Sequence, residues 1–221
     1  MKYESTNPIA TSPSSADEPQ ARGSHLRVAV RPRPDKKRLE ALYRDLLVEL
    51  GEDAERDGLV RTPERMARSL CELTSGYDGD LETVLNGAVF PVEGYQDPVL
   101  VGDVEYYSLC EHHLLPFFGK MSVAYIPENS IIGLSKIPRL IEMFARRLQV
   151  QERLTSQVAD ALEAVIAPRG VAVYSTGFHL CMAMRGVEKQ SSNTTTTAFR
   201  GIYREDDRLR SEFLRFTAPS R

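Results

Sequence analysis

The sequence lacks the marks of several protein classes. It has only three cysteines, Cys71, Cys110 and Cys181, an odd count that cannot build a disulfide framework and suits a reducing compartment. No stretch approaches the ~18 consecutive apolar residues of a membrane span, and the N-terminus has no apolar segment typical of a signal peptide. The net charge of −3 leaves no basic excess for general nucleic-acid binding. We therefore expect a cytoplasmic protein with neither a membrane nor a nucleic-acid partner.

Composition and periodicity divide the chain into three regions. Residues 1–34 are rich in Ser, Pro, Ala and Glu and have almost no large apolar side chains, which predicts a disordered tail. Residues 35–96 contain two amphipathic helical patterns and form the expected N-terminal helical region. Residues 97–221 hold the strand patterns and form the expected catalytic domain. The hydrophobic content of 42% is enough for one buried core.

The order of elements in the third region predicts the fold class. Two strand patterns, "PVLVGDVEYYSL" and "GKMSVAYIP", are followed by two helical patterns, "LSKIPRLIEMFARRL" and "QERLTSQVADALEAVIAP". Two more strand patterns, "GVAVYSTGFHLCMAMRGV" and "NTTTTAFRGIY", precede a short C-terminal helix. Strand pairs joined by short loops form antiparallel sheets, so we expect an α+β fold with helices on one face of the sheet.

The stretch "SLCEHHLLPFFGK", residues 108–120, clusters one cysteine and two histidines. Cys110 and His113 are spaced C-x-x-H. Both can reach one metal only if the chain turns there, because residues three apart on a flat strand point to opposite faces. The following Leu114-Leu115-Pro116 is typical of such a turn. Ordinary core packing of this pair is the alternative for the spacing taken alone.

A second segment, "FHLCMAMRGV", offers a third metal ligand. On an extended strand His179, Cys181 and Arg185 share one face, while the opposite face is apolar. A Cys–His–Cys set leaves the fourth tetrahedral position open, as in catalytic zinc sites, where a water binds. His112 and His179 would then be available as acids or bases beside the metal.

The segment "GLSKIPRL" indicates a site for an anion. Ser135 can cap a helix whose first turn is flanked by Lys136 and Arg139, and free amides at a helix start favour a phosphate. A plain capped helix is the alternative. Arg185, on the expected metal side of its strand, favours a polyphosphate.

The segment "LQVQERL" places Gln151 and Glu152 just before an amphipathic helix. A carboxylate accepts two parallel hydrogen bonds, which complements the N1–H and amino group of guanine. A solvated helix start is the alternative.

Taken together, "SLCEHH", "LSKIPRLIEMFARRLQVQERLT" and "HLCMAMRGV" resemble GTP cyclohydrolase I, from about Asp35 to the C-terminus. The resemblance implies the tunnelling fold, an antiparallel four-stranded sheet with two helices inserted between the strand pairs. It also implies hydrolysis of the guanine ring of GTP, which releases C8 as formate and gives 7,8-dihydroneopterin triphosphate, the first step of folate and pterin biosynthesis.

The resemblance further implies a role for each site residue. Zn²⁺ is held by Cys110, His113 and Cys181. His112 is the main proton donor and His179 assists it. Glu152, with Gln151, anchors the guanine. The triphosphate is neutralised by a cationic set, with Ser135 near the ribose and phosphates; this set is Arg65, Lys136, Arg139 and Arg185.

The resemblance implies a homodecamer of two pentamers, with pockets built from more than one subunit. The sequence departs from the family pattern at Thr176-Gly177, where many members carry an acidic residue and alanine. Thr176 has the opposite strand parity to His179, so the change concerns sheet packing or a subunit contact rather than the zinc.

Three alternative functions stay open at the level of the sequence. The first is another tunnelling-fold enzyme that acts on a pterin or a deazapurine. The second is a zinc-stabilised binding module that senses GTP or pterins. The third is a redox switch in which Cys110 and Cys181 form a disulfide. Formate release from GTP separates the first from the expected activity, loss of turnover without loss of binding separates the second, and counting of free thiols tests the third.

Overall fold

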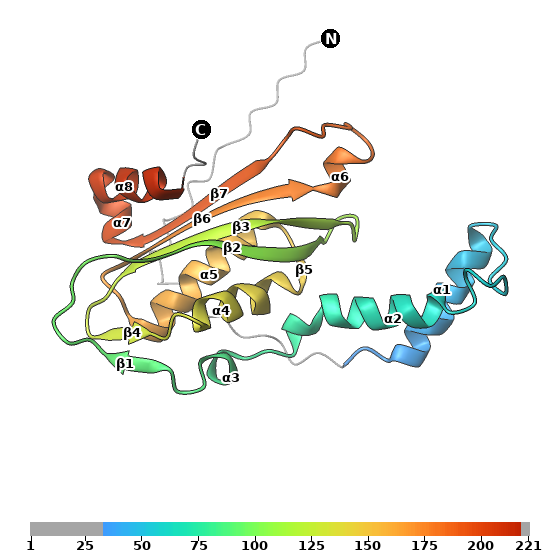
Figure 1. The fold of residues 1–221 in the computed structure, drawn as a ribbon, viewed down its shortest axis with the longest axis horizontal. Coiled ribbons are helices and arrows are strands. Elements are labelled where there is room, and N and C mark those ends of the chain that lie inside the picture. Colours follow the sequence, from blue (N-terminus) through green and yellow to red (C-terminus); the bar gives the residue numbers. More distant parts are fainter. Residues whose placement is uncertain (1–32, 218–221) are drawn as a thin grey trace, which may run out of the picture.

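The computed structural model describes residues 33–217, so the predicted tail lies almost wholly outside the described residues. Figure 1 shows the arrangement of its elements. The helices are α1 (Lys36–Glu49), α2 (Thr62–Leu73), α3 (Leu81–Leu85), α4 (Lys136–Ala145), α5 (Gln151–Ile166), α6 (Leu180–Ala183), α7 (Ile202–Glu205) and α8 (Asp207–Thr217), with a 3₁₀ turn, η1, at Ser75–Tyr77. The strands are β1 (Val89–Pro91), β2 (Val99–Cys110), β3 (Pro116–Ile126), β4 (Ser130–Ile132), β5 (Leu148–Gln149), β6 (Gly170–His179) and β7 (Thr194–Gly201).

The main sheet has the strand order β5-β2-β3-β6-β7. Its four long strands are antiparallel neighbours, and the two-residue β5 adds a short parallel edge beside Leu109 and Cys110. The chain leaves β3, forms α4 and α5, and returns as β6, so two helices are inserted between two strand pairs. The predicted α+β tunnelling fold is confirmed.

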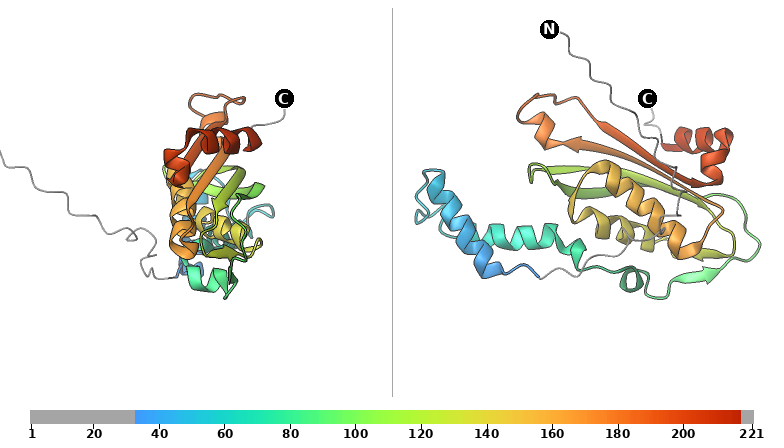
Figure 2. Two further views of the ribbon diagram at one scale, coloured as in Figure 1. Left: turned by 90° about the vertical axis from the view of Figure 1, so that its left-hand side faces the viewer. Right: turned by 180° about the vertical axis from the view of Figure 1, so that it is seen from behind.

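One face of the sheet packs against α4 and α5, which lie side by side along it (Figures 1 and 2). Alternate residues of β3 and β6 point to this face because side chains on a strand alternate between its two sides. Each large apolar side chain buried here contributes roughly 1.5–3 kcal/mol. The core consists mainly of Phe117, Met121, Val123, Tyr125, Val171 and Val173 from the sheet and of Ile137, Leu140, Ile141, Phe144, Leu154, Val158 and Leu162 from the helices.

On the opposite face of the sheet, the described residues cover one end only. There α7 and α8 place Tyr203 and Phe213 over Ala124, Ile126 and Ala172. At the other end of the same face Tyr107 is 61% exposed and stacks on the half-exposed ring of Phe118. This other end is also where β2 and β6 terminate.

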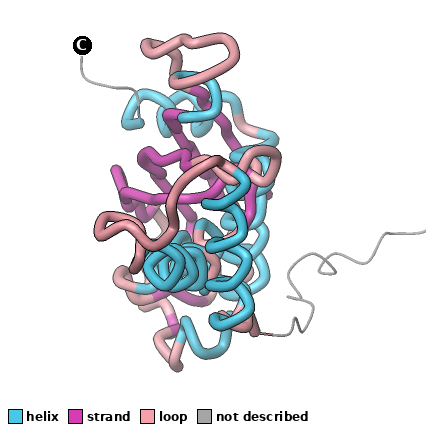
Figure 3. Tube along the Cα trace, turned by 90° about the vertical axis from the view of Figure 1, so that its right-hand side faces the viewer, coloured by secondary structure: helices cyan, strands magenta, loops and turns pink. Residues whose placement is uncertain are grey.

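The helices α1 and α2 form a hairpin that extends away from the sheet (Figure 1). Figure 3 views the molecule from that end, with the hairpin in front of the strands. We call α1 and α2, with the turn between them, the N-terminal arm, and the sheet with α4 and α5 the body. The region 35–96 is not purely helical, since β1 pairs with β4. Within residues 33–217, no helix is both long enough and apolar enough to cross a membrane.

Candidate metal centre and active site

The first two metal-ligand candidates meet because the chain turns at the end of β2. The amides of His113 and Leu114 both donate to the carbonyl of Cys110, at 3.3 and 2.8 Å. Leu114 has a positive φ of 55°, and Pro116 then begins β3. The turn returns the His113 imidazole to the Cys110 thiol, with 3.9 Å between Nδ1 and Sγ. The turn predicted from C-x-x-H-Leu-Leu-Pro is therefore present.

Cys181 reaches the same place by a different route from the one predicted. The expected continuous strand through Arg185 is wrong: β6 ends at His179, and α6 begins at Leu180. The pairing of β6 with β3 stops at Phe117↔His179, next to the start of β3 at Pro116, so no strand is left to pair with. Leu, Met and Ala are good helix formers, and the unpaired chain turns helically there.

The ligand atoms of Cys110, His113 and Cys181 all lie within 4.8 Å of one another. Ideal tetrahedral zinc places a sulfur and a nitrogen about 3.6 Å apart and two sulfurs about 3.8 Å apart, so the set needs only small shifts to hold such an ion. Among the described residues it is the one group of three that meets this criterion. Burial raises the pKa of the Cys181 thiol, and the Cys110 sulfur raises it further. A bound cation favours the thiolate instead.

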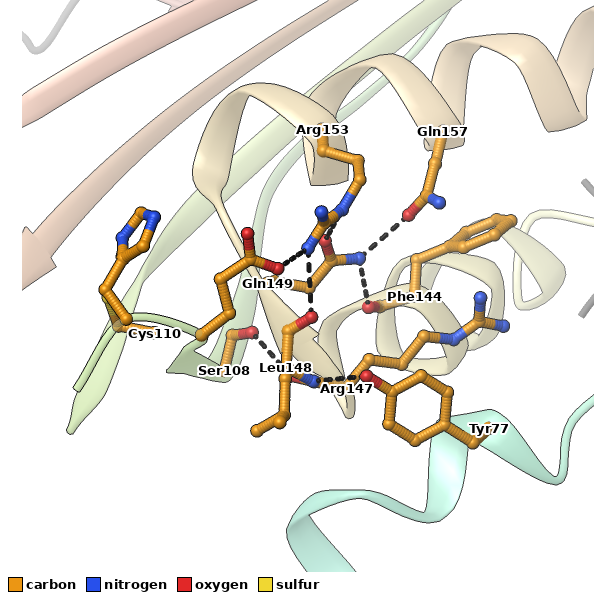
Figure 4. Close-up of polar contacts among 11 residues, drawn as sticks. Tyr77, Ser108, Cys110, Phe144, Arg147, Leu148, Gln149, Arg153 and Gln157 are labelled. Atoms are coloured by element: carbon orange, nitrogen blue, oxygen red, sulfur yellow. Dashed lines mark hydrogen bonds and ion pairs between the residues drawn. The ribbon is translucent and has the colours of Figure 1, made fainter. Parts of the chain in front are cut away.

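The loop between β2 and β3, residues 111–115, which we call the metal loop, is tied to the start of α5 because the Arg153 guanidinium pairs with the Glu111 carboxylate. Arg153 also donates to the carbonyl of Leu148 at 3.0 Å (Figure 4). Its Nε donates to Oε1 of Gln149 at 2.9 Å, and the Gln149 amide donates to the carbonyl of Phe144 at 2.9 Å. The hydrogen bond from Arg153 lowers the pKa of Glu111. These contacts fix the loop against β5 and α5.

Both predicted proton-transfer histidines lie beside the metal-ligand set. His112 is exposed, with its Nδ1 3.7 Å from Cys110 Sγ. His179 is half-buried, and its ring stacks on Phe117 with a centroid distance of 4.6 Å and an interplanar angle of 3°. Burial lowers the pKa of His179, and the negative charge of Glu152 opposes this shift.

Gln151 and Glu152 are adjacent in sequence but differ in environment. Glu152 is exposed at the start of α5 and close enough to His179 to act on its charge. Gln151 is 1% exposed, and its amide is hydrogen-bonded to His179 and to strands β6 and β7. The free group facing outward at this point is therefore the carboxylate.

The cationic set predicted for the triphosphate is divided within one chain. Ser135, Lys136 and Arg139 stand at the start of α4, a helix about 15 Å long, whose far end leads through β5 to the metal loop. Ser135 occupies the N-cap position, but its side chain makes no capping hydrogen bond, so the predicted cap is wrong. Its backbone is helical, with φ −66° and ψ −12°, whereas a capping residue is usually extended.

The remaining cations differ in their distance from the metal centre. Arg185 lies near enough to Cys181 for its charge to lower the thiol pKa, so it belongs to the metal end. Lys136 is only 7% exposed, whereas Arg139 is exposed. Arg65 is exposed on α2, in the N-terminal arm. One chain thus brings the metal ligands, both histidines, Glu152 and Arg185 together, but not the start of α4.

Sequence reasoning missed the side chains that hold the site in shape. Tyr106 donates to the carbonyl of Thr176 at 3.1 Å, and burial raises the pKa of its hydroxyl to about 12. Glu111 and Arg153 are the other omissions. Glu111 could have been found from the sequence, because it lies between the site residues Cys110 and His112. Tyr106 shares strand parity with Cys110, which points it into the same face.

The chain is similar to known proteins over nearly all of its described length. The family model described as GTP cyclohydrolase I matches residues 39–218. A protein of Deinococcus radiodurans named GTP cyclohydrolase 1 is 51% identical over 206 residues, covering 93% of this chain and 92% of that protein. A Chlorobaculum tepidum protein of the same name is 58% identical and covers 80% of this chain and 78% of its own length. A third, from Methylococcus capsulatus, is 54% identical over 80% of this chain and 95% of that protein.

Proposed function

The chain belongs to the GTP cyclohydrolase I family, and we propose that Cys110, His113 and Cys181 form its catalytic zinc centre. The protein is a hydrolase, and its substrate is GTP. The observation that carries the proposed centre is the convergence of two thiols and one imidazole from separate segments, with His112 and His179 beside them. Two sulfurs and one nitrogen form a soft donor set that suits zinc and leaves one coordination position open.

A zinc ion held there supplies Lewis acidity, which makes water a nucleophile at neutral pH. The chain's own residues supply the proton transfers. His112, exposed beside Cys110, gives a proton to N7 of the guanine, and this makes C8 more electrophilic. His179 assists from the other strand. Addition of water at C8 and hydrolysis of the resulting formamide release formate, and the opened intermediate closes to 7,8-dihydroneopterin triphosphate.

Glu152 anchors the guanine. Its carboxylate is exposed, lies close to His179, and can accept two parallel hydrogen bonds from N1–H and the amino group. Gln151, next to it, lines the same subsite, where its amide contacts His179. Arg185, near Cys181, neutralises part of the triphosphate.

The pocket is completed by more than one subunit in a homodecamer of two pentamers. Ser135, Lys136 and Arg139 stand at the far end of α4 from the metal loop, and Arg65 stands on the arm, so a neighbouring copy is the natural source of these groups. The exposed apolar side chains of the arm support assembly as well. In the completed pocket, Ser135 lies near the ribose and phosphates. A reducing cytoplasm keeps the three cysteines as free thiols.

The experiment that tests this function is incubation of the purified protein with GTP, with and without a chelator. We expect formate and a pterin chromophore, both lost on chelation and restored by Zn²⁺. Release of no formate would favour another pterin or deazapurine enzyme. His112→Ala should bind GTP but turn over at most about 1% of the wild-type rate; unchanged turnover would remove His112 from the mechanism.

A further inference from the structure

The amide of Gln151 has only one orientation compatible with its surroundings. One end of the amide lies 3.2 Å from the carbonyl oxygen of Ser175 and 3.1 Å from that of Thr194. Carbonyl oxygens only accept hydrogen bonds, so this end must be the NH₂ group. The Oγ1 of Thr196, 3.2 Å away, is compatible with the same assignment. The other end, Oε1, is therefore an acceptor and nothing else.

That acceptor contacts His179. The distance from Gln151 Oε1 to His179 Nε2 is 2.8 Å, which is a hydrogen bond. Because Oε1 cannot donate, Nε2 must carry the proton, and Nδ1 is the ring nitrogen outside this contact. The Phe117 ring, stacked at 4.6 Å, fixes the plane of the imidazole. Two neighbours thus determine both the orientation and the tautomer of one histidine.

We propose that Gln151 is a positioning residue for the reaction, which holds His179 as the Nε2–H tautomer. Since His179 acts in the reaction only under the function proposed above, this role rests on that function. It assigns to Gln151 an effect on turnover through His179, in place of direct recognition of the guanine.

The test reads the tautomer directly. The sequence has only four histidines, so the zinc-loaded full-length enzyme labelled with ring ¹⁵N histidine gives a simple solid-state spectrum. Subtracting the spectrum of His179→Ala assigns the His179 signals. We expect a protonated Nε2 and an unprotonated Nδ1 in the wild type, with a mixture of tautomers in Gln151→Leu. A wild-type spectrum with a proton on Nδ1 and none on Nε2 overturns the proposal, and this reading needs no variant to fold.

Kinetics provide the second readout. We expect kcat to fall about 100-fold in Gln151→Leu, while KM for GTP changes less than about threefold. The matched control is Thr176→Ala, on the same strand as His179 but with its side chain on the opposite face, which should keep the wild-type kcat. A raised KM with unchanged kcat in Gln151→Leu would make Gln151 a guanine contact and overturn the positioning role.

The role of His179 and the role of Gln151 can be disproved separately. If His179→Ala keeps the wild-type kcat, the role of His179 in the proposed function is wrong, and the role of Gln151 falls with it. If His179→Ala loses activity but the wild-type tautomer is Nδ1–H, the proposed function stands and only the inference about Gln151 is overturned.

Discussion

The N-terminal arm and the body contain helices with the same kind of apolar periodicity but opposite burial. In the arm, α1 has no buried residue, and Leu42 and Leu50 are 50% and 69% exposed. In the body, Ile141 on α4 and Leu154 on α5 are fully buried. Periodicity therefore shows which face of a helix is apolar, but not what covers that face. The body covers its own helices with its sheet, whereas the apolar stripe of the arm needs a partner.

The largest effect that can separate the two regions comes from their cysteines. Cys181→Ser in the body should lower formate release by about 1,000-fold or more and abolish stoichiometric zinc binding, because two ligands do not hold the ion. Cys71→Ser in the arm is the matched control and should leave both unchanged, since Cys71 is outside the metal-ligand group. Elemental analysis and a formate assay measure the two quantities. Full zinc occupancy in Cys181→Ser would remove Cys181 from the site.

Truncation of a leucine should change the free energy of unfolding differently in the body and in the arm. Leu154→Ala should lower the free energy of unfolding by about 2–5 kcal/mol, because it leaves a cavity among side chains of the same subunit. Leu42→Ala should lower it by an amount that depends on protein concentration, since residues 33–217 of the same chain leave Leu42 half-exposed and a second subunit is the expected cover. Urea denaturation at two widely separated concentrations measures both. A concentration-independent loss for Leu42→Ala would mean that the arm is stabilised within its own chain.

Charge on the arm tests the assembly itself. If the proposed oligomer forms, the double variant Leu42→Glu/Leu46→Glu should dissociate it and lower kcat/KM about 100-fold, because the start of α4 and the metal centre then belong to separated copies. Light scattering gives the mass, and zinc content should stay at the wild-type level. Glu40→Gln on the same helix is the control for a changed charge at a polar position. An active monomer would show that one chain forms a complete pocket.

Features that depend on the local pattern could be predicted from the sequence, whereas features that depend on contacts with distant parts of the chain could not. The strand pairs, both inserted helices and the turn between Cys110 and His113 followed from periodicity and from Pro116. The continuous strand through Cys181 failed because side-chain parity does not show where the neighbouring strand β3 starts. For Gln151 the resemblance predicts a part in anchoring the guanine, but the contacts of its amide with β6 and β7 could not be predicted, because those strands lie far along the chain.

The smallest expected effect compares two exposed ion pairs, one in each region. The Arg153–Glu111 pair joins the metal loop to α5 in the body. The Arg44–Glu55 pair lies in the arm. Exposed pairs contribute about 0–1 kcal/mol to stability, so neither Arg153→Ala nor Arg44→Ala should unfold the protein. Arg153→Ala should nevertheless weaken zinc binding about 10-fold, because Arg153 also holds the loop through Leu148 and Gln149. Competition with a chromophoric chelator measures the affinity. Equal zinc affinities in the two variants would show that the loop keeps its shape without this contact, and that the turn after Cys110 is enough to hold it.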